Sequence, residues 1–342
     1  MPNFLFRNTA TDELIRITAD LPLDMRSVLD EGNWDIALTS DWAETGVVIP
    51  NPASRPTHVF LLAGQSNATC RAAFDGGVDW PSNVYQMERW HPLEPVDSQP
   101  IENLVPPNEA SLLPASRPLH HHYRTTPEQF GWALQFSLDY LAMHPGIDVV
   151  LIPCARGATG FSDMRWRPGD DLYEDAVLRS NTLLTTHPEF LFQGILWHQG
   201  ERDANEEMSS SQYTSHLDAM IAGMRADIEA AVEDTPFILG EMLPSYVEQA
   251  PERQAIQTVI QDTPNRINQT SVVVADGTQG SDTVHFNAES MRLIGARYAS
   301  ALALLTQSQT VDDTWSISGS TILSAVVVHR PAVIGTTIYE GA

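Results

Sequence analysis

Four short polar segments of this 342-residue chain contain the residue types that acyl transfer requires. They are Gly64-Gln-Ser-Asn67, Ala155-Arg-Gly-Ala-Thr159, Trp197-His-Gln-Gly-Glu201 and Asp282-Thr-Val-His285. A serine hydroxyl becomes an effective nucleophile when an imidazole takes its proton, and a carboxylate must hold that imidazole in the right tautomer. We interpret Ser66 as the nucleophile, His285 as the general base and Asp282 as the acid that orients the base.

The same segments contain donors for the oxyanion that develops during acyl transfer. We expect the backbone N–H groups of Ser66 and Gly157 and the side-chain amide of Gln199 to form this oxyanion hole. Losing one such donor costs about 3–4 kcal/mol of transition-state stabilisation. Because Asp282 and His285 are three residues apart on one short loop, their contact needs no long-range precision in the fold.

Apolar runs precede these polar segments and predict buried strands. We expect strands over residues 59–63, 84–87, 148–153, 192–197, 236–240 and 270–275. Helical spacing or capping signals predict helices over 68–73, 131–143, 172–186, from 203 to 224, and 288–305. This alternation indicates an α/β domain with a parallel sheet, in which the carboxyl ends of the strands bring the polar segments together.

Two local features refine this picture. Asn67 would cap the helix over 68–73, placing Ser66 beside the positive end of a helix dipole. Asp203 would cap the helix that runs on to Met224, with Glu206 completing a capping box. Residues 74–127 form a long, proline-rich stretch that we expect to overhang the strand ends and shape the substrate site.

The remaining sequence divides into two appendages of short β-like pieces. Residues 1–53 form the first, with strand-like stretches at Leu14–Thr18 and Trp34–Leu38 and a helical turn within Asp24–Asp30. Residues 54–306 form the catalytic domain, and residues 307–342 form a β-rich extension. The stretches 314–317, 321–328 and 336–339 are the strand-like parts of that extension.

Composition excludes several classes of function. The formal net charge is −25, and this surface disfavours nucleic acid and anionic membranes as partners. The chain has no lysine, which excludes Schiff-base and P-loop chemistry. We see no signal peptide and no apolar run of transmembrane length, so the protein is either cytoplasmic or exported by a non-signal route. Two cysteines, Cys70 and Cys154, each lie near a predicted strand end; we interpret them as buried thiols, with a disulfide bond between them as the alternative.

The four ordered blocks resemble those of the SGNH (GDSL-like) hydrolases. The resemblance covers about residues 56–306 and is greatest to the branch of sialate O-acetylesterases and carbohydrate esterase family six, the acetylxylan esterases. It implies a three-layer α/β/α sandwich with a flavodoxin-like sheet, no metal or cofactor, and removal of acetyl groups from sugar hydroxyls. It assigns the triad and the oxyanion hole to the residues named above. This chain departs from the family pattern at Ala158, where a second Gly is usual, and at Arg202, where Ser is common.

Further residues near the blocks are expected to contact the substrate. They are Gln65, Asn67, Arg156, Trp166, Glu201 and Arg202. Arg156 is equally compatible with a substrate carboxylate and with pairing to surface acids, and Glu201 with a structural hydrogen bond. Trp132 and Trp197 fall on predicted core positions, which leaves Trp166 as the sugar-stacking platform. His120-His-His122 lies in a proline-rich loop and is interpreted as a loop segment rather than a metal site.

Two functions fit these observations. The first is a serine esterase that acts on an acetylated carbohydrate. The second is a protein with the same scaffold that attaches to a larger assembly, such as a phage tail or a cell surface, through its β-rich ends. The two are compatible, because an assembly-bound esterase would strip acetyl groups from a host polysaccharide.

Overall fold

The computed structural model describes residues 55–87, 111–119, 126 and 128–307, together with three N-terminal strands. Those strands, β1 (Asn3–Asn8), β2 (Leu14–Thr18) and β3 (Trp34–Asp35), form an antiparallel sheet in the order β2-β1-β3. The strand-like stretches predicted near residues 14 and 34 are therefore strands. The predicted turn within 24–30, the histidines at 120–122 and the extension after residue 307 lie outside the described residues.

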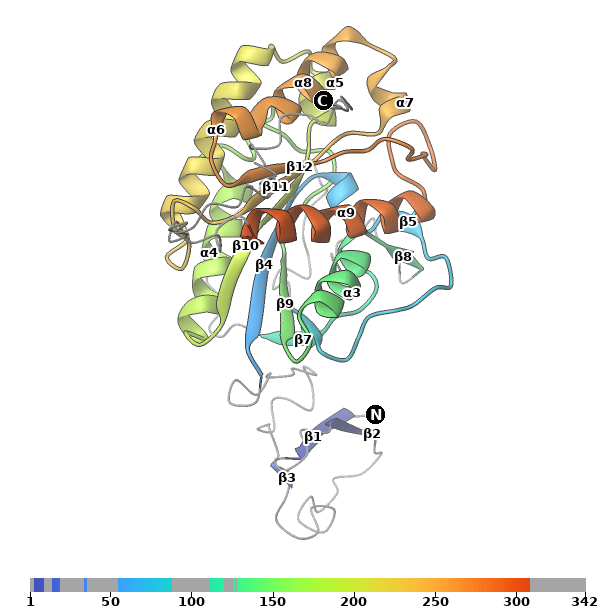
Figure 1. Ribbon diagram of the computed structural model, residues 1–342, viewed down its shortest axis with the longest axis vertical. Helices are drawn as coiled ribbons and strands as arrows, with labels where there is room; N and C mark the ends of the chain where they lie inside the picture. The colour runs from blue at the N-terminus through green and yellow to red at the C-terminus, as the bar shows by residue number, and fades with distance from the viewer. Residues whose placement is uncertain are drawn as a thin grey trace, which may run out of the picture.

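The central sheet has seven strands in the order β12-β11-β10-β4-β9-β6-β7 (Figure 1). Their bounds are β4 Thr57–Gly64, β6 Val84–Met87, β7 Leu112–Pro114, β9 Asp148–Pro153, β10 Leu191–His198, β11 Phe237–Gly240 and β12 Thr270–Val273. All neighbours pair in parallel except β6 and β7, which are antiparallel. Each of the six predicted strands is present, so the parallel α/β architecture expected from the sequence is confirmed.

The order of the strands places the site. Five of them, β9-β4-β10-β11-β12, follow the flavodoxin-like order 2-1-3-4-5, and β6 and β7 extend the sheet beyond β9. The strand that follows β4 in this set, β9, lies on one side of β4, and the later strands β10, β11 and β12 lie on the other. At such a reversal of strand order, a crevice opens between the carboxyl ends of β4 and β10. Ser66 follows β4 and Gln199 follows β10, so both blocks lie at this switch point.

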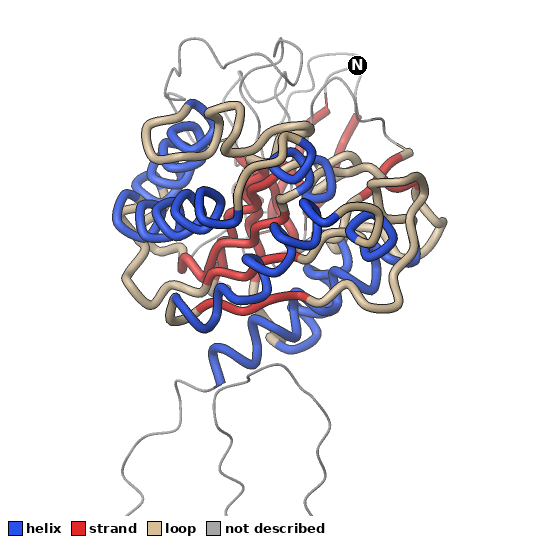
Figure 2. The backbone as a smooth tube through the Cα atoms, turned by 90° about the horizontal axis from the view of Figure 1, so that it is seen from above, coloured by secondary structure: helices blue, strands red, loops and turns tan. Residues whose placement is uncertain are grey.

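Two layers of helices cover the sheet (Figures 1 and 2). The helices are α3 Ala133–Met143, α4 Asp171–Thr186, α5 Glu201–Asn205, α6 Ser210–Asp227, α7 Pro244–Val247, α8 Pro251–Arg266 and α9 Ala288–Gln307. Helices α3 and α9 pack together on one face, while α4, α6 and α8 cover the other. In the described part of the chain, no helix combines the length and apolarity needed to cross a bilayer.

Aromatic packing holds the first layer to the sheet. Strands β4 and β9 are almost entirely buried, as their continuous apolar sequences predict. Phe60 of β4 packs edge-to-face on Phe136 of α3, with ring centroids 5.0 Å apart. At the start of α3, Trp132 stacks on Tyr298 of α9 at 4.1 Å. Trp132 is therefore a core residue, as predicted.

The helix predicted directly after Ser66 is absent. The chain makes one 3₁₀ turn, η1 (Ser66–Ala68), and continues to a short strand, β5 (Ala72–Ala73), which pairs with β8 (Gln129–Phe130). The reason is local. Both the backbone N–H and the hydroxyl of Thr69 donate to the Ser66 carbonyl, at 3.1 and 2.7 Å, and these bonds end the helical conformation after a single 3₁₀ turn. Ser66 therefore does not lie at the positive end of an α-helix.

The helix predicted from residue 203 to 224 is two helices, α5 and α6. Asp203 lies within α5 and caps neither. The capping box belongs to α6, where Ser209 and Gln212 exchange hydrogen bonds. Helix α8 was not predicted. Both cysteines are buried and form no disulfide bond, as predicted.

Candidate active site

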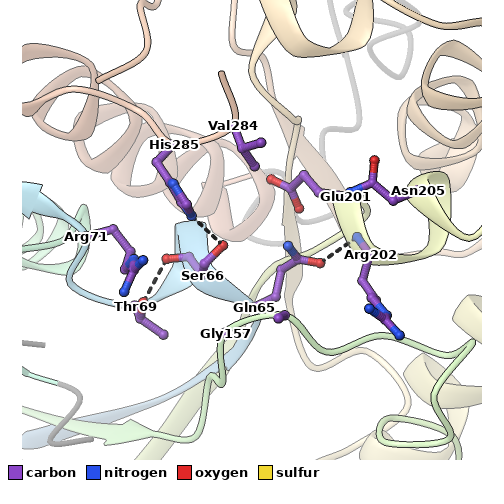
Figure 3. A pocket seen from close by; sticks show the side chains of 11 residues that line it. Gln65, Ser66, Thr69, Arg71, Gly157, Glu201, Arg202, Asn205, Val284 and His285 are labelled. Carbon is purple, nitrogen blue, oxygen red and sulfur yellow. Dashed lines mark hydrogen bonds between the residues drawn. The ribbon is translucent and has the colours of Figure 1, made fainter. Parts of the chain in front are cut away.

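A cavity of about 220 Å³ opens at the carboxyl ends of β4, β9 and β10 (Figure 3). It is lined by residues from four separate parts of the chain: Gln65, Ser66, Thr69, Arg71, Gly157, Ala158, Glu201, Arg202, Asn205, Val284 and His285. All four sequence blocks border this region, so the convergence predicted from the strand order is observed.

The end of β4 is shaped by a glycine. Gly64 has a φ of +125°, and a Cβ at this position would lie 2.2 Å from the carbonyl oxygen of His198 on β10. The next residue, Gln65, donates its backbone N–H to that same carbonyl at 2.9 Å. Because no side chain fits between the strands here, glycine allows β4 to end close against β10 and turn Ser66 toward the cavity.

Ser66, His285 and Asp282 form a continuous hydrogen-bonded line. Ser66 Oγ lies 3.0 Å from His285 Nε2, and His285 Nδ1 lies 2.7 Å from Asp282 Oδ2. Since an ionised carboxylate only accepts, Nδ1 carries a proton and Nε2 is left to accept from the serine hydroxyl. The three side chains therefore meet in the arrangement that the sequence blocks predict.

The carboxylate is held by its own loop. Asp282 Oδ1 accepts the backbone N–H groups of Val284 and His285 at 2.8 and 2.7 Å. Partial burial raises the pKa of Asp282, but the hydrogen bonds from the His285 ring and from the two backbone groups outweigh it and lower the pKa to about 2. Asp282 is therefore ionised at any pH near neutrality and fixes the ring of His285.

Asn67 joins the serine turn to the histidine loop. Its Nδ2 donates to Glu201 Oε1 at 2.6 Å and to the Val284 carbonyl at 3.0 Å, while its Oδ1 accepts the Phe286 N–H at 3.3 Å. Asn67 is fully buried. The expectation that it contacts substrate is therefore corrected: its amide is used within the protein and holds the His285 loop against the serine.

Glu201 lines the cavity, although it is only 1 % exposed. Burial raises its pKa, and the hydrogen bond from Asn67 acts in the opposite direction. Its second oxygen, Oε2, has no hydrogen-bond partner among the described residues. The Glu201 carboxyl group thus faces the serine across the cavity, with Oε1 accepting a hydrogen bond from Asn67 and Oε2 accepting none from the described residues.

The turn after β9 supplies the opposite wall. The Arg156 N–H donates to the Gly64 carbonyl at 2.9 Å, and the Thr159 hydroxyl donates to the Arg156 carbonyl at 2.8 Å. Gly157 and Ala158 then border the cavity, and Ala158 has a φ of 60°. This tight turn brings the Gly157 backbone to the same cavity as Ser66, as the sequence predicts.

Gln199 differs from its predicted placement. Its side chain is fully buried, and it does not line the cavity. Its Nε2 donates to Asp203 Oδ2 at 2.7 Å, and its Oε1 accepts the Tyr213 hydroxyl at 3.0 Å. Two strong buried partners thus direct this amide into the protein.

Two predicted substrate contacts are interior residues. Trp166 is fully buried, donates to Thr159 Oγ1 at 2.9 Å and packs edge-to-face on Trp197. Arg156 is also fully buried, so its side chain does not form the rim. Gln65, Glu201 and Arg202 do line the cavity, as expected.

Several cavity residues were not predicted. Thr69, Arg71, Asn205 and Val284 line the cavity. Asp203 does not line it but accepts a hydrogen bond from Gln199 in the protein interior. Asp203 accepts the backbone N–H groups of Phe161 and Ser162 at 3.1 and 2.7 Å. Its sequence position, four residues after Gln199, was the signal that could have indicated this contact. Within the described ranges, no group of three His, Cys, Asp or Glu residues is arranged to hold a metal ion.

Residues 56–304 match the family described as carbohydrate esterase, sialic acid-specific acetylesterase, and the chain belongs to this family. The central sheet between two layers of helices agrees with the α/β fold that the sequence resemblance implied.

Among individual relatives, the chain is 25% identical over 224 residues to a protein of Escherichia coli (strain K12) named as a probable 9-O-acetyl-N-acetylneuraminic acid deacetylase. The match covers 54% of this chain and 66% of that protein.

Solved structures that share the fold include the following two. One is the crystal structure of NanS, with a TM-score of 0.56 and 21% identity, covering 75% of this chain and 99% of that one. The other is a carbohydrate acetylesterase from Xanthomonas citri, with a TM-score of 0.50 and 18% identity, covering 74% of this chain and 57% of that one.

Proposed function

We propose that this protein is a serine esterase that removes O-acetyl groups from a carbohydrate, with Ser66, His285 and Asp282 as its catalytic triad. One observation carries the proposal: the three side chains are linked at 3.0 and 2.7 Å, and the serine opens into a cavity. Membership in a family of carbohydrate acetylesterases supplies the reaction class.

The geometry supports a two-step acyl transfer. Ser66 Oγ attacks the acetyl carbonyl carbon as its proton passes to His285 Nε2, and the carbonyl electron pair moves to the oxygen. The backbone N–H groups of Ser66 and Gly157 donate to this oxyanion. When the adduct collapses, the bond to the sugar oxygen breaks and His285 returns the proton to that oxygen. Water then attacks the acetyl-serine by the same route, which releases acetate and restores Ser66.

Two arginine side chains border the cavity and suit an acidic sugar, and one of them, Arg202, also pairs with Glu206 at 3.2 Å. Arg71 and Arg202 lie on opposite sides of Ser66, in a protein whose net charge is −25 (Figure 3). Guanidinium groups bind carboxylates with paired hydrogen bonds, and sialic acids carry a carboxylate. We therefore propose an O-acetylated sialic acid as substrate, in line with the name of the E. coli relative. An acetylated polysaccharide without a carboxylate is the alternative.

Acetate release tests both parts of this proposal. We expect release from O-acetylated N-acetylneuraminic acid, and a loss of at least about 10³-fold in the Ser66→Ala variant. The matched control is Ser300→Ala, because Ser300 is exposed on α9 and bonds only within that helix. Faster release from acetylated xylan would overturn the sialic acid assignment alone. Equal turnover by the Ser66→Ala variant would overturn the triad.

The alternative role as an attachment protein depends on the β-rich ends of the chain. Beyond the end of α9 at Gln307, the C-terminal part of the chain lies outside the described residues. The described site gives no support to a binding role without catalysis, whereas its serine–histidine contact supports an esterase.

A further inference from the structure

Gln65 occupies a distinctive place in the site. It lies between Gly64 at the end of β4 and the nucleophile Ser66, and its backbone is anchored to the His198 carbonyl. Its side chain is 3 % exposed and borders the same cavity as Ser66 and Gly157. A side chain held this firmly beside the nucleophile can present a preorganised group to the reacting carbonyl.

The orientation of the Gln65 amide follows from its partners. Its Oε1 accepts the backbone N–H of Arg202 at 3.0 Å and Nε2 of Gln199 at 3.3 Å. A flipped amide would bring NH₂ against two donors, so the hydrogen-bond network selects one orientation. Nε2 must then point away from Arg202, and Figure 3 shows it directed to the space between Ser66 and Glu201. No described residue accepts a hydrogen bond from it.

A buried chain of hydrogen bonds fixes this orientation. The Asp203 carboxylate can only accept, so it holds Nε2 of Gln199 at 2.7 Å, and the Tyr213 hydroxyl holds Oε1 of Gln199 at 3.0 Å. Gln199 in turn presents an N–H to Gln65. Asp203 also accepts two N–H groups from the loop that follows Gly157. One carboxylate therefore positions both the Gln65 amide and the turn that carries Gly157.

The neighbouring amides cannot take the place of Gln65. Nε2 of Gln199 is directed at Asp203 inside the protein, and Nδ2 of Asn67 is directed at Glu201 and the Val284 carbonyl. Asn205 also borders the cavity, but in Figure 3 it lies beyond Glu201 as seen from Ser66.

We propose that the side-chain amide of Gln65 is the third donor of the oxyanion hole, and that Gln199 and Asp203 are positioning residues that aim it. The inference rests on the proposed esterase function. When Ser66 attacks, the negative charge on the former carbonyl oxygen is met by the N–H groups of Ser66, Gly157 and Gln65. Gln199, the donor expected from the sequence, then does not contact the oxyanion but holds the Gln65 amide that does.

The Gln65→Glu variant tests the proposal. Glutamate keeps an oxygen for the Arg202 N–H but replaces the donor by a second acceptor. We expect kcat for an acetyl ester to fall by about 10²–10³-fold with little change in KM, because the lost interaction forms only in the transition state. Gln254→Glu is the matched control, since it makes the same chemical change on the exposed side of α8. Gln65→Ala provides a second variant if the acidic one folds poorly, and thermal unfolding reports folding in each.

The two proposals fail in different ways. Full turnover by Ser66→Ala would refute the esterase triad itself. If Ser66→Ala is inactive but both Gln65 variants keep kcat within about threefold of the wild type, the triad stands and the Gln65 assignment is wrong. Asp203→Asn supplies the positioning test: we expect a smaller fall in kcat than for Gln65→Glu, at unchanged KM. A rise in KM with unchanged kcat would contradict a role in aiming the donor.

Discussion

The Asn67 amide nitrogen donates to Glu201 Oε1 at 2.6 Å and thereby links the serine turn to the start of α5. The same nitrogen donates to the Val284 carbonyl, one residue before His285. A single buried side chain thus ties together three segments that are far apart in the sequence. The distance between Ser66 and His285 depends on this connection.

Replacing Asn67 by alanine should both destabilise the protein and weaken catalysis. Glu201 and the Phe286 N–H would each lose a buried partner, at a cost of about 1–3 kcal/mol per group. Urea unfolding measures the loss, and acetate release measures kcat. Asn265→Ala is the control, since its hydrogen bond to Asp262 is exposed. Equal stability of the two variants would show that Asn67 does not carry this connection.

Asp282→Asn should reduce kcat on the order of 10³-fold, because an amide no longer holds the His285 ring in the tautomer that accepts from Ser66. The pKa of Asp282, lowered to about 2, keeps the wild-type carboxylate ionised down to about pH 3, so the substitution removes a negative charge throughout the neutral range. Steady-state kinetics between pH 6 and pH 8 measure it. Asp276→Asn removes the same charge from the preceding exposed turn and should leave kcat unchanged. If Asp282→Asn keeps the same kcat as Asp276→Asn, the Asp282 carboxylate does not orient His285.

Gly64→Ala should be strongly destabilising, by more than about 3 kcal/mol, because its Cβ would lie 2.2 Å from the His198 carbonyl oxygen and its φ is +125°. Gly146→Ala provides the comparison. Gly146 also has a positive φ, of +85°, but a Cβ there meets nothing within 4 Å. It should cost about 1–2 kcal/mol from backbone strain alone. Similar midpoints of urea unfolding for the two variants would contradict the close approach of β4 and β10.

Stability should fall as the pH decreases from about 6.5 toward 4.5. Burial lowers the pKa of His198 to about 3, and burial together with the nearby His144 lowers that of His58 to about 4. In the unfolded chain both histidines have a pKa near 6.5, so below that pH the unfolded state binds more protons than the folded state. This proton binding stabilises the unfolded state relative to the folded state. Each histidine contributes a slope of at most about 1.4 kcal/mol per pH unit.

His58→Gln isolates one of these contributions. Glutamine can still bond the Tyr140 hydroxyl, which lies 2.7 Å from His58 Nδ1, but it does not titrate. The free energy of unfolding of this variant should depend less steeply on pH between 6.5 and 4.5. An unchanged slope would mean that His58 is protonated as readily in the folded protein as in the unfolded chain.

The sequence predicted the sheet and the triad for the same physical reason. Continuous apolar runs such as 148–153 identify buried strands, and parallel strands deliver their following polar residues to one edge. The Asp282–His285 contact needs only a short loop, so its spacing was sufficient. The family resemblance added the order of the blocks.

The remaining features depend on contacts that no local pattern records. The turn after Ser66 ends early because of the Thr69 hydroxyl, which acts against a helix expected from its neighbours. The direction of the Gln199 amide depends on Asp203 and Tyr213, whose approach only the folded chain reveals. Trp166 follows the second block, yet packing against Trp197 takes it into the core.

Covalent labelling of the nucleophile tests the central claim most directly. A fluorophosphonate reagent reacts with a serine whose proton is taken by a neighbouring imidazole, and peptide mass spectrometry locates the modified residue. We predict that the label is found on Ser66, that it inactivates acetate release in proportion to labelling, and that His285→Ala prevents it. Labelling of another serine, or full acetate release by protein labelled stoichiometrically on Ser66, would contradict the account.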